Sequence, residues 1–373
     1  MIVKLGSLIS EYSVRNKADE DIPVYSVTNE QGFCTGYFSK EVASQDRTTY
    51  KIVPRGCFAY NPSRINVGSV DVQECEDRVI VSPLYVVFSV DEKLNRRYLL
   101  HYLKSDITLT YIKAYASGSV RDNLKFSILK DFPINLPSAE EQGQIVATLD
   151  GIEHLIALRK EEIASLDELV KSRFIELFGD PVYNTKKLPT KRLAELGSLD
   201  RGRSQHRPRN APELLGGPYP LIQTGAVANA GLYITGYSNT YSELGLKQSK
   251  MWKAGTLCIT IAANIAQTSI LTFDACFPDS VVGFIPGDSI SAIYMHYWFG
   301  FFQKILEEQA PQVAQKNINL KILSDLSVVV PNQEQQKDFI AFVEQTDKSK
   351  LAVQNALEEL EILKKSLMKQ YFG

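Results

Sequence analysis

Residues 123–179, which begin NLKFSILKDFPINLPSAEEQ, recur 194 positions later as residues 317–373, which begin NINLKILSDLSVVVPNQEQQ. The two stretches align without a gap over 57 positions, 14 of them identical, and both end in Phe-Gly. A period of 194 residues is far too long for a solenoid repeat. The sequence therefore predicts two similar bodies in one chain, related by an approximate two-fold.

The repeat continues upstream with a varying offset. Leu5-Gly6-Ser7-Leu8 recurs as residues 196–199, at an offset of 191, and Thr35-Gly36-Tyr37 recurs as residues 235–237, at an offset of 200. Loops absorb insertions at little cost, whereas a helix whose length sets a distance cannot absorb them. The contrast predicts variable globular heads on spacers of fixed length.

Each gapless segment contains a long helical pattern. Ser138-Ala-Glu-Glu141 is a capping-box sequence, and Asn332-Gln-Glu-Gln335 repeats it after 194 residues. Apolar residues then alternate at spacings of four and three, which is typical of a coiled-coil seam. This seam includes Ile145, Leu149, Ile152, Ile156, Ile163, Leu166 and Val170 in the first copy, and Val343, Leu357 and Leu360 in the second.

The seam predicts spacer helices at 138–179 and 332–373 that pair with each other as an antiparallel, intramolecular coiled coil. A helix of 40 residues is ~60 Å long, and such an apolar stripe needs a partner. Leu155, Leu158 and Leu169 would then face outward and remain available to another protein. The alternative is that each helix packs only on its own head.

The heads, residues 1–137 and 180–331, combine strand and helix patterns, so the predicted fold class is α+β. Strands are expected at 23–27, 50–53, 57–60 and 79–81 in the first head, and at 219–222, 256–261 and 269–273 in the second. Helices are expected at 95–115 and near 290–309. With 373 residues and 44 % hydrophobic content, both heads can bury a core.

Composition limits the setting of the protein. The five cysteines are odd in number and form no Cys-x-x-Cys pair, and the sequence shows no secretory signal. These observations predict a reduced, cytoplasmic setting without a zinc site. The most apolar stretch, residues 281–302, is interrupted by Gly283, Pro286, Gly287 and Asp288, so no membrane span is expected.

Charge is distributed unevenly although the net charge is only −2. Residues 186–210 contain eight Lys or Arg against Glu195 and Asp200. Such a segment is typical of a loop that grips nucleic-acid phosphates, and the alternative is a solvated charged loop. A strand–loop–strand pattern at 57–72 also places Asn61, Arg64 and Asn66 at a loop tip, with Asn264 and Gln267 as counterparts. Asn and Arg side chains can pair bidentately with base edges.

Catalytic motifs are not evident in the sequence. It has no Gly-x-x-x-x-Gly-Lys-Ser/Thr phosphate loop, and its four histidines lack metal-ligand spacing. Asn61-Pro62-Ser63-Arg64 is similar to the Asn-Pro-Pro-Tyr/Phe motif of adenine methyltransferases. It lacks the aromatic residue that would stack on a flipped base, and no glycine-rich cofactor loop precedes it.

Taken together, these features resemble the specificity (S) subunit of type I restriction–modification systems. The resemblance covers the full length and is carried by residues 136–142 and 330–336, which lead into the helices, and by residues 118–124 and 314–320. It implies that each head is a target-recognition domain reading one half of a bipartite DNA target, while the helices set the spacing. A two-fold protein suits two half-sites.

The resemblance also implies partners and cofactors. Two methyltransferase (M) subunits would dock on this chain, with restriction/translocase (R) subunits joining indirectly. S-adenosylmethionine, ATP and magnesium would bind to these partners, and this chain would hold no cofactor or metal and perform no catalysis. The alternatives are a methyltransferase or restriction–methylation fusion enzyme, and a coiled-coil scaffold with protein-binding heads.

Recognition residues do not carry over from the family, so candidates are placed by pattern and residue type alone. The candidate DNA contacts are Arg15, Lys17, Asn61, Arg64, Asn66, Ser119, Arg121, Asn123, Arg201, Arg203, Ser204, Arg207, Arg209, Asn264, Gln267, Lys316 and Asn317.

Overall fold

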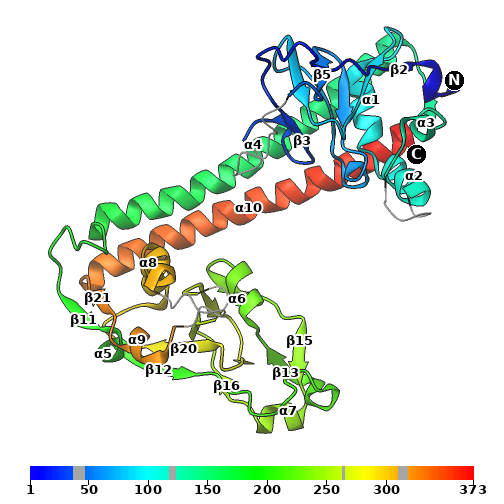
Figure 1. The fold of residues 1–373 in the computed structure, drawn as a ribbon. Coiled ribbons are helices and arrows are strands. Elements are labelled where there is room, and N and C mark those ends of the chain that lie inside the picture. The colour runs from blue at the N-terminus through cyan, green and yellow to red at the C-terminus, as the bar shows by residue number, and fades with distance from the viewer. Residues whose placement is uncertain (37–46, 117–122, 263–264, 310–317) are drawn as a thin grey trace. The chain divides into compact units, whose positions relative to one another are not determined.

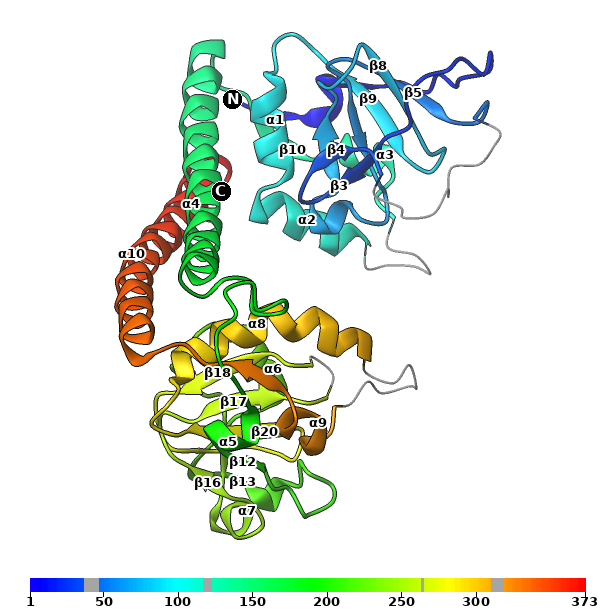
Figure 2. The same ribbon diagram turned by 90° about the vertical axis from the view of Figure 1, so that its left-hand side faces the viewer.

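The computed structural model describes residues 1–36, 47–116, 123–262, 265–309 and 318–373. The chain forms two compact units (Figures 1 and 2). Unit 1 comprises residues 1–161 and 353–373, and unit 2 comprises residues 162–352. The division cuts both long helices, α4 (Ala139–Phe178) and α10 (Gln333–Phe372), so each unit holds one half of each helix.

Unit 1 is built on a four-stranded antiparallel sheet in the order β2-β9-β6-β7. Its strands are β2 (Ile9–Glu11), β9 (Val86–Val90), β6 (Phe58–Tyr60) and β7 (Val70–Val72). Three two-stranded pairs surround it: β1 (Ile2–Lys4) with β10 (Pro133–Asn135), β3 (Ser26–Thr28) with β4 (Gly32–Cys34), and β5 (Lys51–Pro54) with β8 (Arg78–Val81). The helices are α1 (Arg96–Leu103), α2 (Asp106–Ala116) and the short α3 (Phe126–Leu129).

Unit 2 repeats this plan and extends it. Its main sheet runs β12-β20-β17-β18-β14, formed by β12 (Gly197–Arg201), β20 (Val281–Pro286), β17 (Leu257–Thr260), β18 (Thr268–Leu271) and β14 (Tyr233–Ile234). A second sheet contains β15 (Asn239–Tyr241), β13 (Leu215–Leu221), β19 (Ala275–Cys276) and β16 (Met251–Trp252), while β11 (Thr190–Arg192) pairs with β21 (Ser327–Val329). The helices are α5 (Leu193–Leu196), α6 (Thr224–Asn229), α7 (Glu243–Lys247), α8 (Ala292–Gln309) and α9 (Leu320–Ser324).

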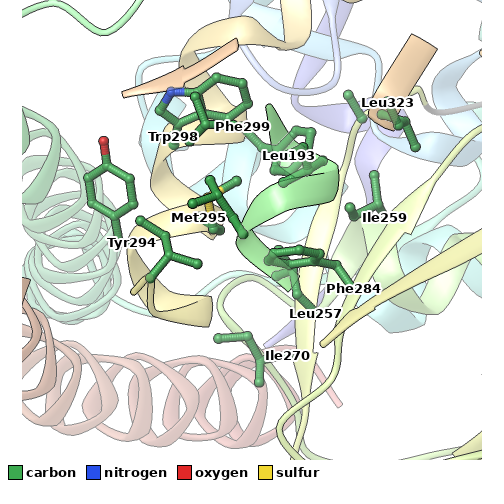
Figure 3. Packing of buried hydrophobic residues seen from close by; sticks show 14 of the residues in the cluster. Leu193, Leu257, Ile259, Ile270, Phe284, Tyr294, Met295, Trp298, Phe299 and Leu323 are labelled. Atoms are coloured by element: carbon green, nitrogen blue, oxygen red, sulfur yellow. The ribbon is translucent and has the colours of Figure 1, made fainter. Parts of the chain in front are cut away.

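The core of unit 2 lies between the main sheet and α8 (Figure 3). Leu257, Ile259 and Phe284 from the sheet meet Met295 and Trp298 from α8, and all five side chains are fully buried. Aromatic residues of the long helices complete this core. Phe174 of α4 lies with its ring centroid 5.4 Å from that of Phe339 of α10 and 5.2 Å from that of Tyr294 of α8. The half-helices are therefore packed into the unit.

The predicted antiparallel pairing of the long helices is confirmed in both units. In unit 1, Lys364 Nζ lies 2.8 Å from Glu153 and Lys160 Nζ lies 3.4 Å from Glu361. In unit 2, Lys350 Nζ lies 2.5 Å from Asp167. Numbers rise along one helix as they fall along the other, which defines an antiparallel pair. Every predicted seam residue is buried or half-buried, whereas Leu155, Leu158 and Leu169 are exposed.

Capping explains where the long helices begin. Glu141 accepts hydrogen bonds from Ser138 N and Oγ at 2.9 Å, and Glu141 N donates to Ser138 Oγ at 3.2 Å, which completes the predicted capping box. The second copy keeps one half of the device, because Gln335 N donates to Asn332 Oδ1 at 2.9 Å. Within the described residues the Gln335 side chain makes no bond in return, so the expectation of a second complete box was wrong.

Sequence expectations for the heads need two further corrections. The helix expected at 95–115 is two helices, because Ser105 ends the first segment and its Oγ accepts from Thr108 N at 3.3 Å at the start of α2. The strand expected at 23–27 begins only at Ser26, although Val24 forms an isolated bridge with Ile80. The α+β class and the order of strands and helices in both heads are as expected.

A buried glutamine at the same repeat position fixes the start of each long helix. Gln142 Nε2 donates to Lys93 O and Pro137 O, and its Oε1 accepts from Asn95 N at 2.7 Å. Gln336 Nε2 donates to Ser289 O and Pro331 O, and its Oε1 accepts from Ser291 N, each at 3.0 Å. Each glutamine therefore satisfies three backbone groups that join a helix start to its unit.

Replacing either glutamine with alanine should lower the free energy of unfolding by about 1–3 kcal/mol, because three backbone groups lose their partners in a buried site. Urea denaturation of Gln142→Ala and Gln336→Ala would measure this loss. Gln144→Ala is the matched control, since Gln144 is exposed on the same helix. Equal stability of all three variants would show that the glutamines are not anchors.

Candidate nucleic-acid interface

The β6–β7 loop of unit 1 holds three of the predicted contact residues. It contains a short 3-10 helix, Ile65–Val67, which ends at Gly68 with a φ of +91°. Ile65 is fully buried and anchors the loop, so Arg64 projects as an exposed side chain while Asn66 is half-buried. No protein partner of the Arg64 guanidinium is found within the described residues.

The Asn61 side chain forms hydrogen bonds within its own loop. Its Oδ1 accepts from Ser63 N at 3.1 Å and from Ser63 Oγ at 2.9 Å, which closes a turn at the start of the loop. A carboxamide oxygen occupied in this way is poorly placed for bidentate pairing with adenine. Asn61 shapes the loop that presents Arg64.

A second segment of unit 1 lies against this loop. Tyr60 Oη donates to Leu124 O at 3.1 Å, and Leu124 N donates to Pro62 O at 3.0 Å. These bonds place the exposed Asn123 beside the loop, where it lines a cavity of about 800 Å³ together with Lys125 and Lys130. Asn123 was predicted from sequence; the two lysines were not, because nothing in the local pattern places them beside the loop.

Arg15 and Lys17 lie elsewhere on unit 1. Arg15 forms an isolated antiparallel bridge with Lys51. The side chains of Arg15 and Lys17 are both exposed. Neither lines the cavity beside Asn123. The structure therefore does not bring them together with Arg64. Ser119 and Arg121 of the same unit, and Asn264, Lys316 and Asn317 of unit 2, lie outside the described residues.

The basic segment of unit 2 is largely paired with its own protein. Arg201 Nε donates to Asp279 O at 2.9 Å, and Arg209 Nη2 lies 2.8 Å from Asp279 Oδ1. Arg207 lies 3.8 Å from the same carboxylate and donates to Ser204 O. By contrast, Arg203 is exposed and makes no side-chain hydrogen bond or ion pair to the described residues, although its charge helps to lower the pKa of Asp200. Of these four arginines, Arg203 alone has a guanidinium without such a bond within the described residues.

The two remaining candidates in unit 2 are poorly exposed. Ser204 is buried, which does not favour a contact with DNA. Gln267 is half-buried in the β17–β18 loop, where its backbone N donates to Thr260 Oγ1 at 3.1 Å.

A titratable cluster joins α1 to the long helices within unit 1. His101, Asp150 and Glu153 offer ligand atoms that all lie within 4.8 Å of one another. However, Arg97 Nη2 donates to Asp150 Oδ1 at 2.8 Å, and Lys364 lies 2.8 Å from Glu153. The cations neutralise the carboxylates, so the cluster is an ion-pair network that positions α1 on the helices.

Burial and pairing shift the titration of this network. Burial lowers the pKa of His101, against the attraction of Glu153 and Asp150. Burial alone would raise the pKa of Asp150, but hydrogen bonds from Arg97 and His101 outweigh it and lower that pKa.

A family model described as the type I restriction modification DNA specificity domain matches residues 6–168 and again residues 186–362. The chain belongs to this family. The two matches cover most of both units, as expected from the duplication. The match favours a specificity subunit over the methyltransferase considered as an alternative.

Individual relatives agree with this assignment. The chain is 29 % identical over 171 residues to the type I restriction enzyme MjaIX specificity subunit of Methanocaldococcus jannaschii. That alignment spans 41 % of this chain and 38 % of the relative.

Two solved structures share the fold across the chain. One is the S subunit of a type I restriction–modification system from M. genitalium, with 15 % identity and a TM-score of 0.58, covering 100 % of this chain and 96 % of that chain. The other comes from a study of complex assembly and conformational transition of the type I R-M system, with 18 % identity and a TM-score of 0.62, covering 100 % of this chain and 97 % of that chain.

Within the part of the chain that the structure describes, no helix is both long and apolar enough to cross a membrane.

Arg203→Ala should weaken binding to cognate and scrambled duplexes alike, because an unpaired guanidinium on a basic segment contacts phosphate rather than bases. The slope of log affinity against log salt should fall by ~0.9 for the lost phosphate contact. A salt titration of duplex binding by the full chain would measure both effects. Lys253→Ala, which removes an exposed cation paired with Asp274, is the control. A loss confined to the cognate duplex would assign Arg203 to base reading instead.

The His101 network should make stability depend on pH. The pKa of His101 is lowered in the folded state, so the unfolded chain takes up this proton first as the pH falls below about 6.5. The free energy of unfolding therefore decreases as the pH falls further. His101→Gln should reduce the difference in unfolding free energy between pH 7.5 and pH 5.5. His154→Gln, an exposed histidine on α4, should leave that difference unchanged. Urea denaturation of both variants and of the unaltered chain at the two pH values would measure these differences.

Proposed function

We propose that this chain is the DNA-reading subunit of a type I restriction–modification complex, and that each unit reads one half of a bipartite target. The observation that carries this proposal is the double match to the DNA specificity domain, one match over most of each unit. Two similar units in one chain suit a target made of two half-sites. The two half-sites would differ in sequence, because the units differ in their loops.

The long helices are proposed to set the spacing between the half-sites. Their seam is mostly apolar, with charged residues such as Arg159 and Lys350 at a few positions, and each helix is joined to a unit by a buried glutamine at its start. A helix held in register at both ends has a fixed length, at ~1.5 Å per residue.

We further propose that two methyltransferase subunits dock on the outer faces of these helices. Several large apolar side chains on these helices are exposed to solvent, and a partner could bury them. In unit 1 they include Leu155 at 44 % and Ile362 at 69 % exposure, and in unit 2 Leu169 at 49 % and Leu351 at 59 %.

Catalysis would then belong to the partners. S-adenosylmethionine, ATP and magnesium are proposed to bind to the methyltransferase and restriction/translocase subunits, and the complex is proposed to be cytoplasmic. On this chain, the one described group with metal-ligand spacing has its carboxylates paired with Arg97 and Lys364.

Lengthening both helices should lengthen the target. The pairs Lys160–Glu361 and Asp167–Lys350 show which positions face each other, so insertions after Glu162 and after Gln354 lie at about the same level. Seven residues in each helix preserve the heptad seam and add ~10 Å, or about three base-pair steps. Methylation of a duplex library by the assembled complex should then report unchanged half-sites with a spacer longer by about three base pairs.

A four-residue insertion in α4 alone, between Leu158 and Glu168, is the contrasting variant. It shifts the helix by ~6 Å and rotates it by about 40°, so it breaks the seam and should abolish assembly or change the spacing. Unchanged spacing with normal assembly in both variants would contradict the proposal that the helices set the spacing between the half-sites. If the unaltered chain supports no sequence-selective methylation, the proposed function itself fails.

A further inference from the structure

The two units differ at one edge of their main sheets. The shared strand order ends at β7 in unit 1 and at the corresponding β18 in unit 2. Beyond β18, unit 2 adds the parallel strand β14 and the helix α6. Beside β7, unit 1 instead carries the separate hairpin β3–β4, drawn in dark blue in Figure 2. If the units read different half-sites, such an edge is where the reading groups are expected.

The hairpin is held rigidly against β7. Ser69 Oγ donates to Val27 O at 2.6 Å in a buried contact, and Phe33 N donates to Asp71 Oδ2 at 3.0 Å. Gly32 has a φ of +61°, and a Cβ at this position would lie 1.8 Å from Asp71 Oδ2. A larger residue at this strained position would displace the Asp71 carboxylate that accepts from Phe33 N, so glycine helps to hold the turn against the sheet.

A cavity of about 410 Å³ is lined by residues of the hairpin turn and of the β6–β7 loop. The two elements touch, because Asn29 Oδ1 lies 2.4 Å from the place that a Cβ on Gly68 would take. The turn contributes Glu30 and Gln31, and the loop contributes Arg64.

The side chains of Glu30, Gln31 and Arg64 are all exposed. Within the described residues, no hydrogen bond or ion pair of these three side chains to the protein is found. Asn61 also lines the cavity, but its Oδ1 is bonded to Ser63. The cavity thus presents a guanidinium, a carboxylate and a carboxamide whose hydrogen-bonding capacity is unused, on a backbone that is already fixed.

We propose that Glu30, Gln31 and Arg64 are the specificity-determining residues of unit 1, and that they read base edges in the major groove of its half-target. This inference rests on the proposed function and deepens it. Arginine pairs bidentately with guanine, glutamine with adenine, and a carboxylate accepts from the cytosine amino group. A backbone that is already fixed lowers the entropy that is lost on binding. Asn61 is a positioning residue, since it shapes the turn before Arg64.

Gln31 and Arg64 line the same cavity of about 410 Å³. The two side chains therefore read positions within one half-site. No position in the half-site of unit 2 should depend on either residue.

The test measures sequence preference position by position. The full chain, assembled with its methyltransferase subunits, is given a duplex library randomised over both half-sites, and the methylated fraction is sequenced. Gln31→Ala and Arg64→Ala should each reduce discrimination by about 5- to 150-fold, equivalent to ~1–3 kcal/mol, at one position. The two affected positions should lie in the same half-site, and the other half-site should be unchanged. Glu30→Gln should alter a position in the half-site that these two variants affect.

Three further variants separate base reading from other roles. Glu92→Gln changes an exposed carboxylate outside the cavity and should leave all preferences unchanged. Arg64→Lys keeps the charge but loses the bidentate fork, so it should relax specificity while preserving the salt dependence. Asn61→Ala should shift the preference at the position read by Arg64.

Several outcomes would overturn the proposal while leaving the function in place. Unchanged preferences in Gln31→Ala and Arg64→Ala would do so, as would an equal loss on all sequences or full specificity in Arg64→Lys. Assembly of each variant, followed by size-exclusion chromatography, excludes misfolding as the cause. If the unaltered complex shows no sequence preference in either half-site, the proposed function has failed instead.

Discussion

Two buried glutamines, Gln142 and Gln336, determine where the long helices begin. Each carboxamide makes three hydrogen bonds to backbone groups, and two of these groups belong to the turn that leads into the first helix after the main sheet, α1 or α8. Leaving such a group unsatisfied in a buried site costs about 1–3 kcal/mol. Moving a helix by one residue would break all three bonds at once. The start of the seam is therefore fixed relative to the core of each unit.

The other ends of the helices are fixed by aromatic residues that repeat in the same way. Phe178 at the end of α4 lies with its ring centroid 5.0 Å from that of Tyr294, and Phe372 at the end of α10 lies 5.2 Å from Tyr98. Tyr294 also donates a hydrogen bond to Val329 O, and Tyr98 donates one to Asn135 O. These two carbonyls occupy the same position in the two repeats. Each unit thus holds the start of one long helix and the end of the other. An insertion in either helix would disturb an anchor or the seam, which explains why the helical repeat has no gap.

The regular parts of the fold could be predicted because their signals are local or periodic. The sequence pattern alone predicts a seam with ten apolar positions and two helix caps. It also predicts strands such as 57–60 and 256–261. The candidate site was harder to predict from the sequence. Asp279 pairs with Arg209, which lies 70 residues away in the sequence, and no local pattern predicts that ion pair. Glu30 and Gln31 lie in an ordinary polar turn, and their relation to Arg64 arises only when the hairpin folds against β7. The motif containing Gln142 was visible, but the partners of its carboxamide come from a turn 47 residues away.

Pairing between charges also bears on how such a protein would tell sequences apart. Arg201, Arg207 and Arg209 are held by Asp279, and Arg97 and Lys364 by carboxylates of α4, so these five cations are already engaged within their own units. Sequence-independent affinity grows with the number of phosphates that free cations neutralise. Under the proposed function, each cation engaged in this way contributes less to the attraction for random DNA. Base contacts then decide a larger share of the binding free energy, and the ratio of specific to non-specific affinity rises. A near-zero net charge is in this sense compatible with a selective reader of DNA, because selectivity depends on that ratio and not on affinity alone.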